Sequence, residues 1–325
     1  MDDAMAMHRA MANAESVRGT TSPNPWVGAV VTAADGSMFD GATNPPGGAH
    51  AEIVALASAG EHAAGATLTV TLEPCVHHGR TPPCTDAIVA AGIRRVVVGI
   101  QDPDPRVAGR GIAALRAAGV EVSTGEATAL ITTQLEPYIV HRSTGRPYVL
   151  LKLAATLDGR TAAADGSSRW ITGPEARVDV HRLRAESDAV LVGAGTVRAD
   201  NPALTVRDAD GRNPLRVVLG RAPTDARVRP CLELSGDLAD VLDDLGRRGI
   251  MQVLVEGGAT VAHQLHHAGL VNRYVIYLAP CLAAGSDSSP MFQGPAAATI
   301  DSLWRGRFRS VTQLGSDLRI ELDPA

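Results

Sequence analysis

Two short stretches of the sequence carry residues that could bind a metal. The first is the tripeptide His50-Ala51-Glu52, and the second is EPCVHHGRTPPC, which holds Cys75 and Cys84 with eight residues between them. Zinc prefers thiolate and imidazole ligands, and a catalytic zinc keeps three protein ligands with a fourth position open for water. His50, Cys75 and Cys84 supply that number and those types. The sequence therefore predicts one Zn²⁺ site built from both stretches.

Glu52 indicates which kind of reaction this predicted site could catalyse. In zinc-dependent nucleobase deaminases an H-x-E pattern precedes P-C-x-x-C, and the glutamate moves protons without binding the metal. Zinc makes hydroxide available near neutral pH, and a carboxylate must then carry a proton to the departing amine. Glu52 is the candidate for that catalytic task, and Pro74-Cys75 opens the second part of the pattern. The gap to Cys84 is longer than in the pattern, which a metal-binding loop tolerates.

The longer gap inserts His77, His78 and Arg80 beside the predicted metal. These side chains could contact a substrate, or they could belong to an ordinary solvated loop. A purely structural zinc in a non-enzymatic interaction module is a further alternative, and it would need His77 or His78 as a fourth ligand. Replacing Glu52 by glutamine would then leave function intact, whereas a catalytic zinc predicts that ammonia release is lost.

The second half of the sequence contains the only lysine. Of the 30 basic residues, 29 are arginine and one is Lys152. A lone lysine suggests a position that needs a compact ammonium group in place of a planar guanidinium. Lys152 lies in the apolar stretch YVLLKLAATLDGR, where a buried cation needs a partner or a ligand. Chance retention of one lysine on a solvated strand face is the alternative.

Two glycine-containing motifs could bind a phosphorylated ligand. VGAGTVRADNPALTVR brings Thr196, Asp200 and Arg207 to the end of a predicted strand, and VEGGATVAHQL places Gly257 and Gly258 before a predicted helix. Free backbone N–H groups at such a helix start could face a diphosphate. A plain strand-to-helix turn is the alternative. Because G-x-G-x-x-G is absent from the sequence, a dinucleotide site here would not be of the Rossmann type.

The elements that must position these residues alternate between helices and strands, which predicts an α/β fold with a layered sheet. In the first half we expect helices at residues 2–16, 51–60, 85–91 and 111–118, and strands at 27–32, 67–72, 95–100 and 120–123. In the second half we expect helices at 174–186, 238–248 and 259–267, strands at 148–154, 189–193, 215–219, 252–256 and 274–278, and two closing strands after Arg309.

The length of the chain indicates more than one domain. With 325 residues the chain exceeds one ordinary domain of roughly 100–200 residues. The helix and strand pattern blurs at YIVHRSTGRPY, where Ser, Thr, Gly and Pro cluster, so we place the boundary near Gly145 and expect domains at 1–145 and 146–325.

A net charge of −5 and 3% aromatic residues disfavour nucleic acid as a partner. No segment approaches the roughly 18 apolar residues of a membrane span, and the N-terminus lacks a targeting pattern, so we expect a cytoplasmic protein. In that compartment cysteines serve as metal ligands or core residues more often than in disulfides, and Cys231 and Cys281 have no role that we can assign.

Several of these motifs resemble one family. Asn24-Pro25-Trp26-Val27-Gly28, HAE, LEPC followed by VHHGRTPPC, and DPDPRVAGRGIAALRAAG are similar to the bifunctional deaminase/reductase of riboflavin biosynthesis, whose own pattern contains the eight-residue gap. The resemblance implies an N-terminal cytidine-deaminase-like domain with three α/β/α layers. It also implies that Asn24 binds the pyrimidine and that His77 and Arg80 hold the ring or its phosphoribosyl group. Two positions depart from the family pattern, because Thr43 stands where a histidine is usual and Val76 where a serine is usual.

The second half resembles the reductase domain of the same family through KLAATLDGRTA, SRWITGPEAR, GAGTVRADNPALTVR and VEGG. This implies an α/β fold similar to dihydrofolate reductase, with NADPH as cofactor. The residues implied for the cofactor are Ala154, Trp170, Thr196, Asp200, Gly258, Ala259, Thr260, Val261, Ala262, His263 and Gln264. Those implied for the substrate are Ser168, Arg184, Leu204, Arg207 and Glu256, with Lys152 as the catalytic candidate.

The family would deaminate a ribosylaminopyrimidine phosphate and then reduce its ribosyl group to ribityl. The match fails between Arg216 and Gly236, where the family has another strand and this sequence runs almost directly into the next helix. We therefore expect that strand to be missing, which would weaken the pocket for the cofactor's adenosine. An active deaminase joined to a catalytically silent reductase-like domain is the alternative. The expected partner is a small-molecule substrate, and a homo-oligomer is compatible with a sequence that gives no firm indication of assembly.

Overall fold

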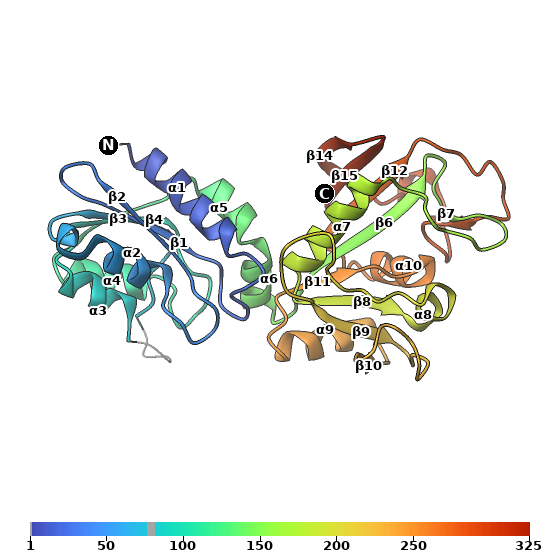
Figure 1. The fold of residues 1–325 in the computed structure, drawn as a ribbon, viewed down its shortest axis with the longest axis horizontal. Coiled ribbons are helices and arrows are strands. Elements are labelled where there is room, and N and C mark those ends of the chain that lie inside the picture. The colour runs from blue at the N-terminus through green and yellow to red at the C-terminus, as the bar shows by residue number, and fades with distance from the viewer. Residues whose placement is uncertain (1, 77–81) are drawn as a thin grey trace. The chain divides into compact units, whose positions relative to one another are not determined.

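The chain forms two compact units, residues 1–145 and 146–325 (Figure 1). The computed structural model describes residues 2–76 and 82–325. Each unit has a mixed sheet with helices beside it, which confirms the predicted α/β class. Among the helices of the described residues, none is both long and apolar enough to cross a membrane.

The sheet of the first unit, within its described residues, has the strand order β2-β1-β3-β4-β5. β1 pairs antiparallel with β2 and β3, whereas β3, β4 and β5 run parallel. Valine and threonine favour strands, and the three central strands of this sheet are buried along most of their length. The strands are β1 (Gly28–Thr32), β2 (Met38–Ala42), β3 (Thr67–Leu72), β4 (Arg95–Ile100) and β5 (Glu121–Thr124).

Helices cover both faces of this sheet. A Cβ on Gly28 would lie 1.8 Å from a backbone oxygen of α1, and one on Gly41 would lie 2.1 Å from a backbone oxygen of α2. Gly41 pairs with the residue after Gly28, so the two glycines point to opposite faces. Gln134 of α5 donates to the backbone oxygen of Met11 in α1, which puts α5 on the α1 face. The unit therefore has the predicted three layers, with helices α1 (Asp3–Ser16), α2 (Ala51–Ala59), α3 (Cys84–Ala90), α4 (Arg110–Ala117), α5 (Thr128–Gln134) and α6 (Glu136–Thr144).

The second unit, which is described throughout, is built on a sheet in the order β10-β9-β8-β11-β6-β12-β15-β14. The strands from β10 to β12 run parallel, and β15 and β14 add an antiparallel edge. The main strands are β6 (Tyr148–Thr156), β8 (Ala189–Gly193), β9 (Leu215–Leu219), β10 (Leu232–Leu234), β11 (Gln252–Val255), β12 (Arg273–Ala279), β14 (Gly306–Leu314) and β15 (Asp317–Pro324). A small separate pair joins β7 (Arg160–Ala162) to β13 (Ser289–Pro290).

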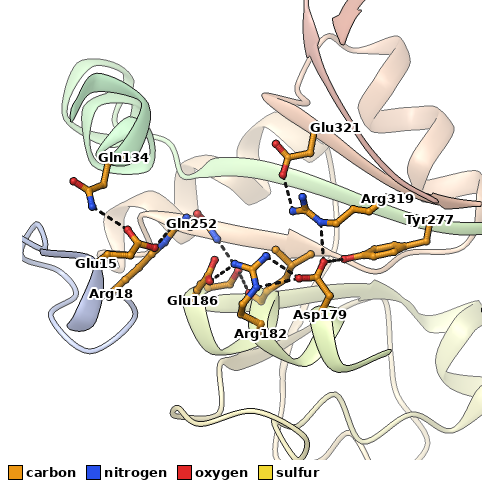
Figure 2. A network of polar contacts seen from close by, with 12 residues as sticks. Glu15, Arg18, Gln134, Asp179, Arg182, Glu186, Gln252, Tyr277, Arg319 and Glu321 are labelled. Carbon is orange, nitrogen blue, oxygen red and sulfur yellow. Dashed lines mark hydrogen bonds and ion pairs between the residues drawn. The ribbon is translucent and has the colours of Figure 1, made fainter. Parts of the chain in front are cut away.

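The two faces of this second sheet pack against different helices. Leu151 and Leu153 of β6 belong to one core with side chains of α9 (Leu238–Arg247) and α10 (Ala259–His267). Strand alternation turns Lys152 to the opposite face, which α7 (Pro174–Glu186) covers. On that face Tyr277 of β12 donates to Asp179 of α7 at 2.5 Å (Figure 2).

The structure differs from the sequence-based expectation at several short elements. The expectation that the strand between Arg216 and Gly236 is missing was wrong, because Leu232–Leu234 pairs with β9 as β10. The segment read as an irregular boundary is the helix α6, with a proline in its first turn and Gly145 at its end. The expectations also missed β2, β7, β13, α5 and α8 (Ala194–Asp200).

Candidate functional site

Three elements of the first unit bring the predicted zinc ligands together. His50 is the N-cap residue of α2, Cys75 follows β3, and Cys84 is the first residue of α3. The Nδ1 atom of His50 lies 3.6 Å from the Sγ atom of Cys75 and 3.3 Å from that of Cys84. All three ligand atoms lie within 4.8 Å of one another.

These distances fit a tetrahedral zinc ion. Bonds of about 2.3 Å to sulfur and about 2.0 Å to nitrogen place the two ligand atoms about 3.5 Å apart. The Cys84 thiol, as a hydrogen-bond donor, lowers the pKa of Cys75, and the His50 ring and the Cys84 backbone N–H act in the same direction. The pKa of Cys84 is raised, because its thiol donates to Cys75 and is buried. One imidazole and two sulfurs, with a fourth corner left over, are the donor set of a catalytic zinc site.

Glu52 lies in the first turn of α2, two residues after His50, and its side chain is buried. Burial raises the pKa of Glu52 to about 7, and the nearby Cys75 adds to the effect. A carboxyl group with a pKa near neutrality can both accept and return a proton at physiological pH. This is the property that a proton shuttle beside the metal requires.

Glu73 is a further residue of this site that the sequence reasoning missed. It directly follows β3 and precedes Pro74-Cys75. Its buried carboxylate accepts three backbone N–H groups, from Asp102 at 3.2 Å, Gly109 at 2.9 Å and Ile112 at 3.1 Å. Gly109 and Ile112 begin α4, which has no side-chain cap of its own. Glu73 therefore ties the start of α4 to the metal-binding turn, and its place inside the quoted EPC stretch was the available signal.

The predicted pyrimidine-binding residues of the first unit are only partly described. Asn24 is half-buried in the turn before β1, where its backbone N–H donates to the oxygen of Thr21. Thr43, which replaces the family's usual histidine, is buried and its hydroxyl accepts from the Val27 N–H at 3.2 Å, so it extends the β1–β2 pairing. His77 and Arg80 lie outside the described residues.

The second unit contains a cavity of about 1660 Å³ near the C-terminal ends of β6, β8 and β11. A buried charged cluster lines it. Glu256 accepts from Arg184 at 2.5 and 2.9 Å and lies 3.7 Å from the Nζ atom of Lys152. Burial lowers the pKa of Lys152, and Arg184 lowers it further while Glu256 opposes them. Burial would raise the pKa of Glu256, but Arg184 and Lys152 together hold it below its ordinary value.

The start of α10 fits a diphosphate at the same cavity. Gly258 is the N-cap of α10 and offers no side-chain hydrogen bond, so the first N–H groups of the helix are open to a ligand. A Cβ on Gly258 would lie 3.1 Å from the hydroxyl of Thr196, and one on Gly257 would lie 2.9 Å from Val261. Gly258 therefore keeps this turn close to α8, and Gly257 leaves room for the first turn of α10. The cavity is large enough for a dinucleotide and a substrate.

Almost all residues predicted for this second site line the cavity. Ala262 is the exception, because the helical period turns it into the core between α10 and the sheet. Trp170 is exposed, with the Arg177 guanidinium 4.8 Å from its ring centre. The lining residues are Lys152, Ala154, Ser168, Trp170, Arg184, Thr196, Asp200, Leu204, Arg207, Glu256, Gly258, Ala259, Thr260, Val261, His263 and Gln264.

The sequence reasoning also missed lining residues of this cavity. His181, Arg198 and Arg227 contribute to its wall. His181 lies three residues before Arg184 on the same helix, which was a usable signal. Arg227 lies in the segment whose sequence matched the family poorly, so no motif marked it.

Two protein families match the chain, one on each unit. The cytidine and deoxycytidylate deaminase zinc-binding region matches residues 1–100, and the RibD C-terminal domain matches residues 147–320. The chain is 43% identical to the riboflavin biosynthesis protein RibD of Mycobacterium tuberculosis, over 99% of this chain and 97% of the relative. It is 40% identical to RibD of Escherichia coli, over 99% of both chains.

Solved structures agree over the full length. Acinetobacter baumannii RibD superposes with a TM-score of 0.93 at 38% identity, covering 99% of both chains. A Thermotoga maritima diaminohydroxyphosphoribosylaminopyrimidine deaminase and 5-amino-6-(5-phosphoribosylamino)uracil reductase gives 0.92 at 34% identity, again covering 99% of both chains. These matches confirm the predicted fold class. The chain therefore belongs to the RibD family of bifunctional riboflavin-biosynthesis enzymes, which join a zinc-dependent deaminase to an NADPH-dependent reductase.

Proposed function

We propose that residues 1–145 carry out the deamination and residues 146–325 the reduction. The two family matches, to residues 1–100 and 147–320, fall on either side of this boundary and support it. The substrate is a ribosylaminopyrimidine phosphate that first loses an exocyclic amine as ammonia and then has its ribosyl group reduced to ribityl. The observation that supports this proposal most directly is the cluster of His50, Cys75 and Cys84, with the buried Glu52 in the adjoining turn of the helix.

In the first step His50, Cys75 and Cys84 hold the metal, which supplies ionised water as a nucleophile when bound. Glu52 would take up a proton from the attacking water and deliver it to the departing amine, which its raised pKa permits. Asn24, His77 and Arg80 bind the pyrimidine and its phosphoribosyl group. Burial of Glu52 keeps bulk water from competing for the proton.

In the second step bound NADPH would supply a hydride to the C1′ carbon of the ribosyl group, whose bond to the ring oxygen breaks, and a proton from solvent completes the reduction. The start of α10 and the residues Thr196 and Asp200 hold the cofactor, while Lys152 and Glu256 orient the sugar and balance charge as the hydride arrives. Arg184 is already occupied by Glu256, so its guanidinium fixes that carboxylate. Arg207 is exposed at the cavity wall and is the arginine placed to bind the 5′-phosphate.

The direct test uses the purified full chain. With the diaminopyrimidine nucleotide it should release ammonia, and with the deaminated intermediate it should oxidise NADPH, seen as loss of the cofactor's absorbance. Release of ammonia without any NADPH oxidation would favour the alternative of a silent reductase-like unit. The presence of β10 and of the continuous cavity supports the active reductase. If neither product formed with metal bound, the structural-zinc alternative would take precedence.

We further propose that the protein works in a reducing compartment such as the cytoplasm, where its cysteines remain thiols.

We also propose that the protein forms a homo-oligomer. β14 ends the sheet, and a bulge at Arg309 puts Phe308 and Val311 opposite Leu322 and Ile320, on one face. Phe308 and Val311 are 72% and 57% exposed, so a second copy could cover them. Light scattering should give a multiple of the chain mass, and a monomer would refute the assembly.

We also propose that the protein binds a small-molecule substrate and that it binds neither nucleic acid nor a membrane. The acidic net charge supports this choice, because phosphate backbones bind basic surfaces. A filter-binding measurement with single-stranded DNA should show no retention at physiological salt. Retention at that salt would contradict the proposal.

A further inference from the structure

The segment that follows α8 has its backbone held by side chains. Residues 201–207 belong to no helix or strand, so the sheet does not fix them. The backbone oxygen of Thr205 accepts from Arg184 at 3.1 Å, and the N–H of Val206 donates to a side-chain oxygen of Asn213 at 2.7 Å. Such an arrangement satisfies backbone groups that would otherwise be unpaired, and it fixes the path of the chain.

His181 of α7 holds the next residue of this segment. The N–H of Arg207 donates to the Nδ1 atom of His181 at 3.2 Å. Because Nδ1 accepts, the ring proton belongs on Nε2. That atom lies 3.3 Å from a carboxylate oxygen of Asp208 and 3.5 Å from the Nη2 atom of Arg207, so His181 contacts both the backbone and the guanidinium of Arg207. The His181 side chain is buried, and burial together with Arg184 and Arg207 lowers its pKa, while Asp208 and Glu256 oppose the shift. The hydrogen bond from the Arg207 N–H requires a free lone pair on Nδ1, which a neutral ring with its proton on Nε2 provides.

This hydrogen bond fixes the backbone of Arg207 and therefore the position from which its side chain extends. Its guanidinium is exposed at the cavity wall and donates to the hydroxyl of Thr205 at 3.1 Å. Just upstream, Leu204 has a φ of 53°, a left-handed conformation that is strained for a residue with a side chain. The contacts from α7 offset that strain and hold the turn that aims Arg207 at the cavity.

α7 is itself a firm support for these contacts. His181 and Arg184 lie three residues apart and so share a face of the helix. On another side, Asp179 accepts from Tyr277 of β12 at 2.5 Å and pairs with Arg319 of β15 at 2.7 Å (Figure 2). The helix is thus anchored to two strands while His181 and Arg184 reach the segment beside it.

We propose that His181 is a positioning residue for the reductase reaction, because its neutral ring sets Arg207 in the orientation that binds the substrate's phosphate. His181 acts through Arg207 and need not touch the reacting carbon. This inference rests on the proposed function, in which Arg207 binds the 5′-phosphate. It assigns His181 to phosphate recognition and not merely to the stability of α7.

The test compares two substrates in the full chain: the deaminated intermediate and the same compound without its phosphate. His181→Leu removes the acceptor, so the KM of the phosphorylated substrate should rise about tenfold with kcat little changed, as a misplaced binding group predicts. The kcat/KM of the dephosphorylated compound should stay near the parent value. His181→Asn places an amide oxygen near the position of Nδ1 and should restore most of the lost affinity.

Two controls separate positioning from general damage. Asp179→Asn weakens the other anchor of α7, so it should lower the melting temperature without changing the ratio of kcat/KM between the two substrates. Ammonia release by the same chain reports on the other unit and should be unchanged in every variant. If His181→Leu lowered kcat/KM equally for both substrates, or if His181→Asn failed to restore the ratio, the positioning role would be overturned.

Arg207→Ala distinguishes failure of this inference from failure of the proposed function. It should abolish the preference for the phosphorylated substrate. If Arg207→Ala abolishes the preference but His181→Leu keeps it, then Arg207 binds the phosphate and His181 does not position it. Should Arg207→Ala keep the preference, the proposed phosphate site is wrong, and the inference drawn from it falls too.

Discussion

At the scale of single residues, Glu52 is the proposed proton carrier of the first unit. Replacement by glutamine keeps the size of the side chain but removes the group that takes and returns a proton. We predict that Glu52→Gln lowers the rate of ammonia release by about 10²–10⁴-fold, the usual contribution of a general acid–base group. Zinc content measured by mass spectrometry of the metal should equal that of the parent, because Glu52 is not a ligand.

The matched control for Glu52 is Glu61→Gln, which changes an exposed acid of the same unit. It should leave both ammonia release and zinc content at parent values. Loss of zinc from Glu52→Gln would mean that Glu52 binds the metal, and retained ammonia release would mean that it is not the proton carrier.

The burial of Lys152 should be visible in the pH dependence of the reductase activity. Its pKa is lowered, chiefly by burial, and a lysine is charged only below its pKa. The ammonium group is therefore lost at a lower pH than for an exposed lysine, so NADPH oxidation should decline earlier on the alkaline side. Lys152→Arg keeps the charge and should remove this alkaline limb even though kcat falls.

The pH profile of kcat for NADPH oxidation by the parent and by Lys152→Arg measures this effect. Lys152→Met should be slow at every pH, since it carries no charge to lose. An alkaline limb that persisted unchanged in Lys152→Arg would assign the titration to another group.

Residue types alone could predict much of the zinc site. His50, Cys75 and Cys84 were identifiable because few side chains bind zinc and their spacing matched a known pattern, and the fold brings them within 4.8 Å. The roles of His181 and Glu73 could not be found that way. Both act on backbone N–H groups that are remote in sequence, and such hydrogen bonds leave no local motif.

At the scale of elements, α4 depends on a cap from outside the helix. Glu73 accepts from Gly109 and Ile112, the N-cap and third residue of α4. In Glu73→Gln one oxygen would be replaced by an NH₂ group that faces N–H donors. We predict a loss of about 1–3 kcal/mol in the free energy of unfolding, measured by urea denaturation, with weaker zinc retention in competition with a chelator.

Glu73→Ala should lower the free energy of unfolding at least as much, because it leaves all three backbone donors without an acceptor. Glu61→Gln again serves as the exposed control. Parent stability and parent zinc retention in Glu73→Gln would show that the contacts of Glu73 are dispensable.

Strong strands and amphipathic helices were predictable because their patterns are local. β8, β9, α7 and α10 have the predicted bounds, since valine-rich runs and helical spacing specify them. β2 and β10 are short and gain their structure from pairing with β1 and β9, which no local pattern reveals. The signals for α6 were present as Pro137 at its start and Gly145 at its end, but the polar segment between them was read as a boundary.

At the scale of the whole molecule, each unit has its own sheet and its own candidate site. The zinc ligands belong to residues 50–84, and the residues lining the large cavity belong to residues 152–293. We propose that one chain performs two reactions, each with its own set of residues. Removing the metal should therefore affect one activity and spare the other.

Metal removal tests that claim most directly. The full chain, stripped of zinc by a chelator, is assayed for ammonia release from the diaminopyrimidine nucleotide and for NADPH oxidation with the deaminated intermediate. The account predicts that ammonia release is lost and returns when zinc is added back, while NADPH oxidation continues at the parent rate. Ammonia release that survives complete loss of zinc, or NADPH oxidation that disappears with it, would contradict the account.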